Sequence, residues 1–201
     1  MCSSDLHEHD NDSAWAALTT SKRNFNAAVK AAREAGAIPN ILTCDTFTGW
    51  AFANGNSAST NAYLDARAGF ADLVGTDMDG IDPQGYSSFS TGWPTTGTPL
   101  YFDFVGQEYT KTISFMQRNG YTGWCVPEFS TFRHPTNDAN GNIRVAWMNW
   151  QVGKFNALAI KPYYVTFFDF SNRPTVADHL ECLELTNEIN AWKAAIATNP
   201  A

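Results

Sequence analysis

The chain has 201 residues, with 13 Lys and Arg against 20 Asp and Glu, and its net charge of −7 argues against binding to the phosphate backbone of nucleic acid. Hydrophobic residues make up 44% and charged residues 16%, so the chain can bury a core, and disorder over most of its length is excluded. No apolar run approaches the roughly 18 residues of a membrane span. We expect a folded protein whose partner is neither nucleic acid nor a membrane.

The first predicted element is a helix that Asp12 or Ser13 caps and that Gly36 ends. Apolar residues recur along it at spacings of three and four, and we expect these residues to face the core: Trp15, Leu18, Phe25, Ala28, Val29 and Ala32. The same spacing predicts three further helices, at 109–119, at about 143–155 and from about 175 to 198.

Four short runs rich in apolar, aromatic and β-branched residues are predicted to be strands: 37–44, 70–76, 120–127 and 161–168. A carboxylate follows each run, in the order Asp45, Asp77, Glu128 and Asp169. Strands that alternate with helices favour a parallel sheet covered by helices. The steps between the carboxylates average about 41 residues, which fits a (β/α)8 barrel. The rival is a doubly wound nucleotide-binding sheet, but no glycine-rich phosphate loop follows any run.

A (β/α)8 barrel has eight strands, whereas this sequence supplies four and the end of a fifth at His7 and Glu8. We therefore expect an α/β protein in which residues 1–201 form a partial TIM barrel that is truncated at its N-terminus. Residues 1–6 resemble a translated sequencing adapter and are expected to be non-native. An open half barrel leaves sheet edges uncovered, so we expect the chain to self-associate.

The four cysteines are far apart in the sequence and form no C-x-x-C motif, which argues against a zinc knuckle or a redox motif. Cys44 and Cys125 lie in apolar runs. We expect both to be small buried core residues rather than partners in a disulfide, because free cysteine is among the most buried residue types.

Carboxylates that follow parallel barrel strands gather at one face, although they are far apart in the sequence. Clustered carboxylates shift one another's protonation, and cleavage of a glycosidic bond needs one carboxylic acid and one carboxylate. Glu128, between Pro127 and Phe129, is the first catalytic candidate, and the alternative is a surface glutamate that opens a loop. Glu8 is the second, with histidines on both sides to orient it, and the alternative is a frayed polar terminus.

Other polar and aromatic residues are candidates for binding the substrate. Asp45, Asp77 and Asp169 are expected near sugar hydroxyl groups, although Asp45 and Asp77 are equally suited to capping the segments that follow them. Trp50 and Trp93 are expected to stack on sugar rings, with packing of their loops as the alternative. The cluster His7, Glu8, His9 and Asp10 also suits a metal ion, but its spacing differs from the helical H-E-x-x-H pattern.

Three motifs, in their order along the chain, resemble those in the second half of a clan-A glycoside hydrolase, most closely the family 26 group that includes endo-mannanases. His7-Glu8 is similar to the group's His-Glu at the end of strand four, and Pro127-Glu128-Phe129 is similar to the end of strand seven. Ala71-Asp72-Leu73-Val74-Gly75-Thr76-Asp77 is similar to its sixth strand. The resemblance implies a chain that runs from the end of strand four through helix eight.

The resemblance also implies a function. Glu8 would be the acid/base and Glu128 the nucleophile of a retaining enzyme that hydrolyses a β-linked polysaccharide. His7 would belong to the substrate site, no cofactor or metal would be needed, and this class of substrate implies a secreted or extracellular protein. We expect the isolated segment to be inactive. Two alternatives remain: a catalytically inactive carbohydrate-binding or phage-tail-associated barrel protein, and a metal-dependent hydrolase.

Overall fold

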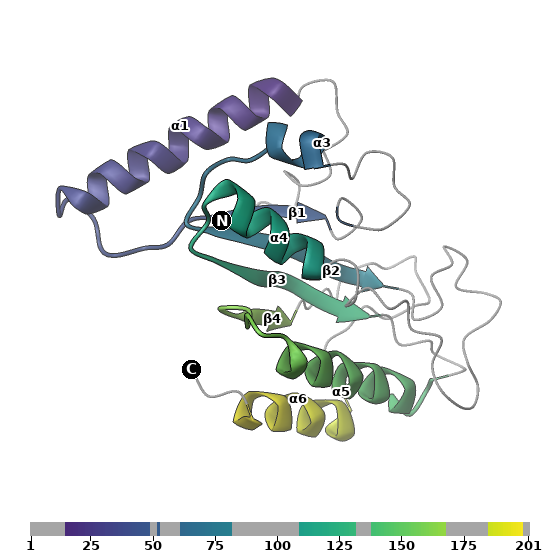
Figure 1. Cartoon of the computed structure of the whole chain (residues 1–201). Coiled ribbons are helices and arrows are strands. Elements are labelled where there is room, and N and C mark those ends of the chain that lie inside the picture. The colour runs from purple at the N-terminus through teal and green to yellow at the C-terminus, as the bar shows by residue number, and fades with distance from the viewer. Residues whose placement is uncertain are drawn as a thin grey trace, which may run out of the picture. The chain divides into compact units, whose positions relative to one another are not determined.

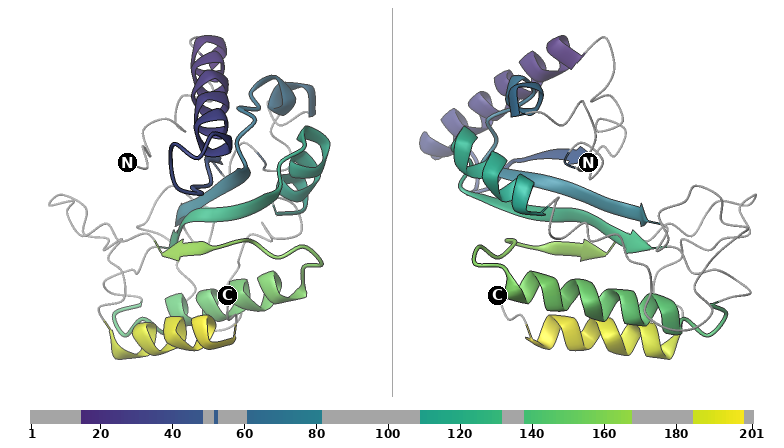
Figure 2. Two further views of the ribbon diagram at one scale, coloured as in Figure 1. Left: turned by 90° about the vertical axis from the view of Figure 1, so that its left-hand side faces the viewer. Right: turned by 45° about the vertical axis from the view of Figure 1, so that its right-hand side comes forward.

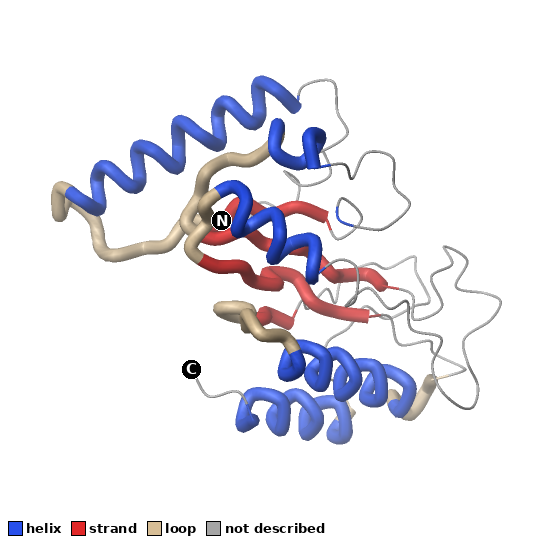
Figure 3. Tube along the Cα trace, viewed as in Figure 1, coloured by secondary structure: helices blue, strands red, loops and turns tan. Residues whose placement is uncertain are grey.

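A four-stranded parallel sheet, in the order β1-β2-β3-β4, organises the fold. This computed structural model describes residues 15–48, 52, 61–81, 109–131, 138–167 and 185–198. The strands are β1 (Cys44–Thr48), β2 (Leu73–Ile81), β3 (Gly123–Thr131) and β4 (Val165–Phe167). The helices are α1 (Trp15–Glu34), α3 (Asn61–Ala66), α4 (Thr110–Asn119), α5 (Asn142–Ala157) and α6 (Thr186–Thr198). Strands and helices alternate along most of the part of the chain that the structure describes, as Figure 3 shows, so the predicted α/β class is confirmed.

The chain divides into two compact units, and the division falls within β2, β3 and β4. The first unit contains α1, β1, α3, α4 and the N-terminal parts of β2 and β3 (Figure 1). The second contains α5, α6 and most of β4. In the first unit β1 pairs in parallel with β2, from Cys44 opposite Leu73 to Thr48 opposite Asp77. Figure 2 shows β2 and β3 side by side and running in the same direction.

The strands begin later than the sequence predicts, and Asp45, Asp77 and Glu128 lie within them rather than after them. Asp45 is the second residue of β1, and Glu128 is the sixth of the nine residues of β3. The apolar run before β1 instead forms a local turn, in which the Ile41 N–H donates to the Pro39 carbonyl. Phe70 has a φ of 57° and Gly120 a φ of 74°, and this left-handed backbone delays the start of β2 and β3.

The fully buried residues of α1 are polar, which corrects the expected apolar face in part. Half-buried are Trp15, Leu18, Val29 and Ala32, whereas Ala28 is exposed. Thr19 and Asn26 are the buried residues of the helix, whereas Phe25 is 64% exposed. The reason lies in the segment before β2, whose carbonyl groups need donors. Asn26 donates to the Gly69 carbonyl over 2.9 Å, and Arg23 donates to the Ala68 carbonyl over 2.7 Å. Helix α1 therefore packs through these hydrogen bonds as well as through its half-buried apolar residues.

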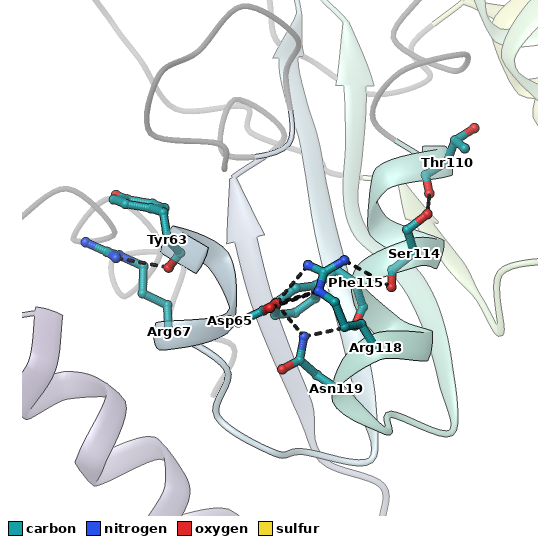
Figure 4. Close-up of polar contacts among 8 residues, drawn as sticks. All are labelled: Tyr63, Asp65, Arg67, Thr110, Ser114, Phe115, Arg118 and Asn119. Atoms are coloured by element: carbon teal, nitrogen blue, oxygen red, sulfur yellow. Dashed lines mark hydrogen bonds and ion pairs between the residues drawn. The ribbon is translucent and has the colours of Figure 1, made fainter. Parts of the chain in front are cut away.

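Charged side chains join the short helix α3, which periodicity does not predict, to α4. Asp65 accepts hydrogen bonds from the guanidinium of Arg118, the shortest over 2.7 Å, and from the Asn119 amide over 2.8 Å (Figure 4). Helix α4 follows the predicted bounds closely, and Gly120 ends it in the left-handed conformation. The two helices contact each other, and both belong to the first unit.

An aromatic cluster forms the core of the second unit. Phe129 of β3 stacks on Trp147 of α5 with ring centroids 4.7 Å apart. Trp192 of α6 also stacks on Phe129, with ring centroids 6.0 Å apart. Trp147 is 1% exposed, as expected for a residue at helical spacing in the core. The helix predicted from about 175 is described from Thr186 onward. Helices α5 and α6 lie side by side in Figures 1 and 2.

Candidate active site

Glu128 lies in the second half of β3 and is 8% exposed. Pro127 precedes it and fixes its own φ, and Phe129 follows it in the aromatic cluster of α5, β4 and α6. Both neighbours therefore hold the backbone of Glu128 in place. A carboxylate that is buried on a restrained backbone has a defined position, which a nucleophile or a general acid requires.

Asp45 occupies a different environment, on the side of β1 that faces α1. Its side chain is fully buried, the Tyr121 hydroxyl donates to Oδ2 over 2.7 Å, and the Gly69 N–H donates to the same oxygen. Lys22 of α1 places its ammonium 3.2 Å from Oδ1. Burial raises the pKa of the Tyr121 phenol and the Asp45 charge raises it further, so the phenol stays a donor.

These contacts give Asp45 a structural part in the first unit. The carboxylate joins β1 to α1, to the loop before β2 and to the start of β3, and its oxygens already have three protein partners. Residue spacing in the sequence does not predict that Lys22 and Tyr121 contact Asp45. They lie 23 and 76 positions from it in the sequence, and only the fold brings them together. Binding of a sugar hydroxyl by Asp45 would require this cluster to open.

Most of the other predicted site residues lie outside the described residues. Asp77 is placed by its backbone alone, in β2 opposite Thr48 of β1. The residues that lie outside are His7, Glu8, His9, Asp10, Trp50, Trp93 and Asp169. The pairing of Glu8 with Glu128 therefore stays a prediction, as do the stacking tryptophans and the metal alternative.

Cys44 and Cys125 form a contact that the sequence analysis does not anticipate. Neither cysteine forms a disulfide. Cys125 is fully buried, as expected, whereas Cys44 is partly exposed, which corrects the expectation that both are buried. Their Sγ atoms are 3.3 Å apart. This hydrogen bond lowers the pKa of the Cys44 thiol, and burial raises the pKa of the adjacent Tyr164 phenol. The sequence carries only a weak signal for this contact, namely that both cysteines lie in apolar runs.

Within the described residues, no group of three or more His, Cys, Asp or Glu side chains is arranged to hold a metal ion. The same part of the chain contains no helix that is both long and apolar enough to cross a membrane. Neither observation extends to the segment that carries His7 and Glu8.

Comparisons with family models, with curated proteins and with solved structures gave no match to this chain. The class of protein is therefore defined by its own fold and site: an α/β protein with a parallel sheet and a buried glutamate in the third strand. Any statement about its chemistry rests on these residues.

Proposed function

We propose that this chain is the C-terminal part of a (β/α)8 glycoside hydrolase that cleaves a β-linked polysaccharide with retention of configuration. The single observation that carries the proposal is Glu128, a buried carboxylate held in a central strand of a parallel α/β sheet. The carboxylates of such enzymes lie on barrel strands, and burial together with neighbouring charge sets their protonation.

In the proposed mechanism Glu128 attacks the anomeric carbon while Glu8 protonates the leaving oxygen. Glu8 then removes a proton from water, which hydrolyses the glycosyl ester on Glu128 and regenerates both side chains. This chemistry requires the two carboxyl groups about 5 to 5.5 Å apart. No cofactor takes part.

His7, Trp50, Asp77, Trp93 and Asp169 are the proposed sugar-binding residues. Carboxylates accept hydrogen bonds from hydroxyl groups, imidazole both donates and accepts them, and indole faces stack on sugar rings. Asp45 is left out, because Lys22, Gly69 and Tyr121 surround its carboxylate.

The test uses the longest reading frame that contains these residues and an aryl β-glycoside with a good leaving group. Replacing Glu128 with Ala should lower kcat at least about 10³-fold, because the covalent step is lost. Added azide should restore turnover and give a glycosyl azide of inverted configuration, since the small anion occupies the space of the missing carboxylate. The matched control is Glu34→Gln, which alters an exposed carboxylate at the end of α1 and should leave kcat unchanged.

Full activity of the Glu128→Ala enzyme would contradict the assignment. Binding of polysaccharide without any release of reducing sugar from the unaltered protein would favour an inactive carbohydrate-binding barrel. Activity that a chelator abolishes and a divalent metal restores would favour a metal-dependent hydrolase.

A further inference from the structure

The thiols of Cys44 and Cys125 meet across the strand that lies between them. Cys44 belongs to β1 and Cys125 to β3, and β2 separates these strands in the sheet. Their Sγ atoms are nevertheless only 3.3 Å apart, and neither forms a disulfide in the structure. The fold therefore brings together two reduced sulfur atoms that lie 81 positions apart in the sequence.

Gly75 of β2 leaves the space for this contact. A Cβ atom at Gly75 would lie 3.0 Å from the Cys44 sulfur and 3.0 Å from the ring of Pro127 in β3. These distances are shorter than those of ordinary van der Waals contact. Because glycine has no side chain, the two thiols can reach toward each other over the backbone of β2, on one face of the sheet.

The separation of the sulfur atoms also shows that β1 and β3 bend toward each other. Neighbouring strands are about 4.8 Å apart, so two steps across a flat sheet would separate β1 from β3 by about 9.6 Å. Only two covalent bonds, which meet at an angle, join each sulfur to its own Cα. Sγ atoms that are 3.3 Å apart therefore require the two Cα atoms to be closer than a flat sheet allows.

A disulfide between these cysteines needs a further but limited approach. Its S–S length is about 2.05 Å and its Cα atoms are about 4.4 to 6.8 Å apart, so the two sulfurs must approach by about 1.3 Å. Strand β1 can supply this movement. It has five residues, lies at the end of the strand order and pairs only with β2 among the described strands. Because no second ladder holds it, β1 can tilt toward β3.

The two thiols differ in access and in reactivity. Cys44 is partly exposed, whereas Cys125 is fully buried. Hydrogen bonds with the Cys125 thiol, the Thr46 hydroxyl and the Tyr164 phenol lower the pKa of the Cys44 thiol, although burial opposes this shift. The Thr46 oxygen is 3.5 Å from the Cys44 sulfur. Since the thiolate is the nucleophile, Cys44 is the thiol that reacts first with a soluble reagent.

We propose that Cys44 and Cys125 are a redox pair that forms a reversible disulfide, with a low-molecular-weight disulfide of the glutathione type as the oxidant. The Cys44 thiolate attacks one sulfur of the reagent, whose S–S bond breaks, and one glutathione leaves as a thiolate that takes up a proton. The Cys125 sulfur then loses its proton and attacks the Cys44 sulfur, and the second glutathione leaves in the same way. The protein thiols give up two electrons and two protons, and the reagent is reduced to two thiols.

The new bond would tie β1 to β3 and close a loop that contains α3, β2 and α4. A crosslink of this kind favours the folded state because it restricts the unfolded chain. The redox conditions around the protein would thus set how firmly the first unit is held together. Both cysteines lie in this unit, and the pair needs no residue of the proposed catalytic site.

The experiment places the purified chain in glutathione buffers of increasing oxidised-to-reduced ratio. Cys2 and Cys182 are first replaced with Ser, so that only the proposed pair reacts. Acid quenching, alkylation of the remaining thiols and mass spectrometry then measure the reduced, glutathione-bound and disulfide forms. We expect a single transition to the Cys44–Cys125 disulfide, with little glutathione-bound protein, and its reversal by dithiothreitol.

The disulfide should be favoured at least about tenfold more in the folded chain than in concentrated urea, because the fold already holds the sulfurs together. By linkage, the disulfide then shifts the folding equilibrium toward the folded state by the same factor. Urea unfolding of the oxidised and reduced proteins measures this shift independently. The Cys125→Ser protein, treated in the same buffers, is the control and should show no gain in stability.

Two single variants test the order of the steps. Cys125→Ser should retain glutathione on Cys44, since no second thiol displaces it. Cys44→Ser should leave the buried Cys125 unmodified while the chain is folded. Circular dichroism checks that both variants fold, and alanine replaces serine at a position where the serine variant does not.

Three results would overturn the proposal. The first is the absence of the disulfide at every glutathione ratio. The second is glutathione that stays on Cys44 in the starting protein, because Cys125 would then fail to complete the exchange. The third is a disulfide that forms equally well or better in urea, since the fold would then hold the two sulfurs in a geometry that opposes the bond.

Discussion

Asp72 joins three segments of the first unit through one carboxylate. Arg33 at the end of α1 donates two hydrogen bonds to it, over 2.9 and 2.7 Å. The backbone N–H of Thr43 donates to the same carboxylate over 2.9 Å, and so does the Thr43 hydroxyl over 3.0 Å. The Arg33 guanidinium, followed by these Thr43 donors, holds the pKa of Asp72 well below its usual range.

Replacing Asp72 with Asn should destabilise the protein at neutral pH by about 1 kcal/mol, a value reduced from that of a fully buried pair because solvent reaches both partners. The effect should depend on pH. Because the folded-state pKa is depressed, the carboxylate contributes its full stability above the unfolded-state pKa of about 3.9 and loses it as the pH falls toward the folded value. Urea unfolding at pH 7 and pH 3 should therefore show a smaller difference between the two proteins at pH 3.

Asp65→Asn is the matched control for that substitution. Its carboxylate also pairs with an arginine, but about a third of each side chain is exposed, and exposed pairs contribute below about 1 kcal/mol. A loss of stability for Asp65→Asn as large as that for Asp72→Asn, or a pH-independent effect of Asp72→Asn, would contradict the role given to Asp72.

The start of each helix and strand is where local pattern and structure differ most. Helices 109–119 and 143–155 are close to the observed α4 and α5, because helical spacing and the Asn119-Gly120 end are local signals. The strands start later because the Pro39 carbonyl accepts a local hydrogen bond from Ile41 and Phe70 has a left-handed φ, and an apolar run reveals neither feature. The polar contacts of α1 were also hidden, since their hydrogen-bond acceptors lie more than 40 positions away.

The N-termini of α5 and α6 meet at Gly141, and this contact makes a glycine substitution informative. Gly141 has a φ of 71°, and a Cβ there would lie 2.7 Å from Oε1 of Glu188 in α6. Gly141→Ala should therefore destabilise the second unit by about 1 to 3 kcal/mol. Gly153, within α5, has no atom within 4 Å of a built Cβ. Gly153→Ala should stabilise the helix by about 0.5 to 1 kcal/mol.

Chemical denaturation followed by tryptophan fluorescence compares the two alanine variants, because Trp147 and Trp192 report on the second unit. Opposite signs are the expected result. If both variants lose similar stability, the contact between Gly141 and Glu188 does not control how α5 and α6 begin.

For the whole molecule, the strand order places β1 at one end of the sheet, and apolar residues just before it are exposed. Ile41 is 54% and Leu42 45% exposed. Edge strands and apolar patches promote association with other chains. We expect the purified chain to self-associate with increasing concentration, as the sequence predicts for an open half barrel.

Replacing Ile41 and Leu42 together with Lys should shift sedimentation velocity profiles toward the monomer, because edge charges oppose strand pairing between chains. Phe25→Lys is the control for the single substitution Ile41→Lys, since each places one lysine charge at an exposed apolar residue. A chain that stays monomeric at every concentration, or equal effects of the edge and helix variants, would contradict association through the β1 edge.

The sequence by itself determined the α/β class and the approximate helices, because periodicity and end signals act over a few neighbouring residues. It also singled out Glu128, which directly follows the apolar residues Trp124 to Pro127 of its strand. Only the tertiary structure decided that Asp45 is enclosed by Lys22 and Tyr121 and that Cys44 meets Cys125, 81 positions away. Contacts at that separation depend on strand register and on the small volume of Gly75, which no local spacing encodes.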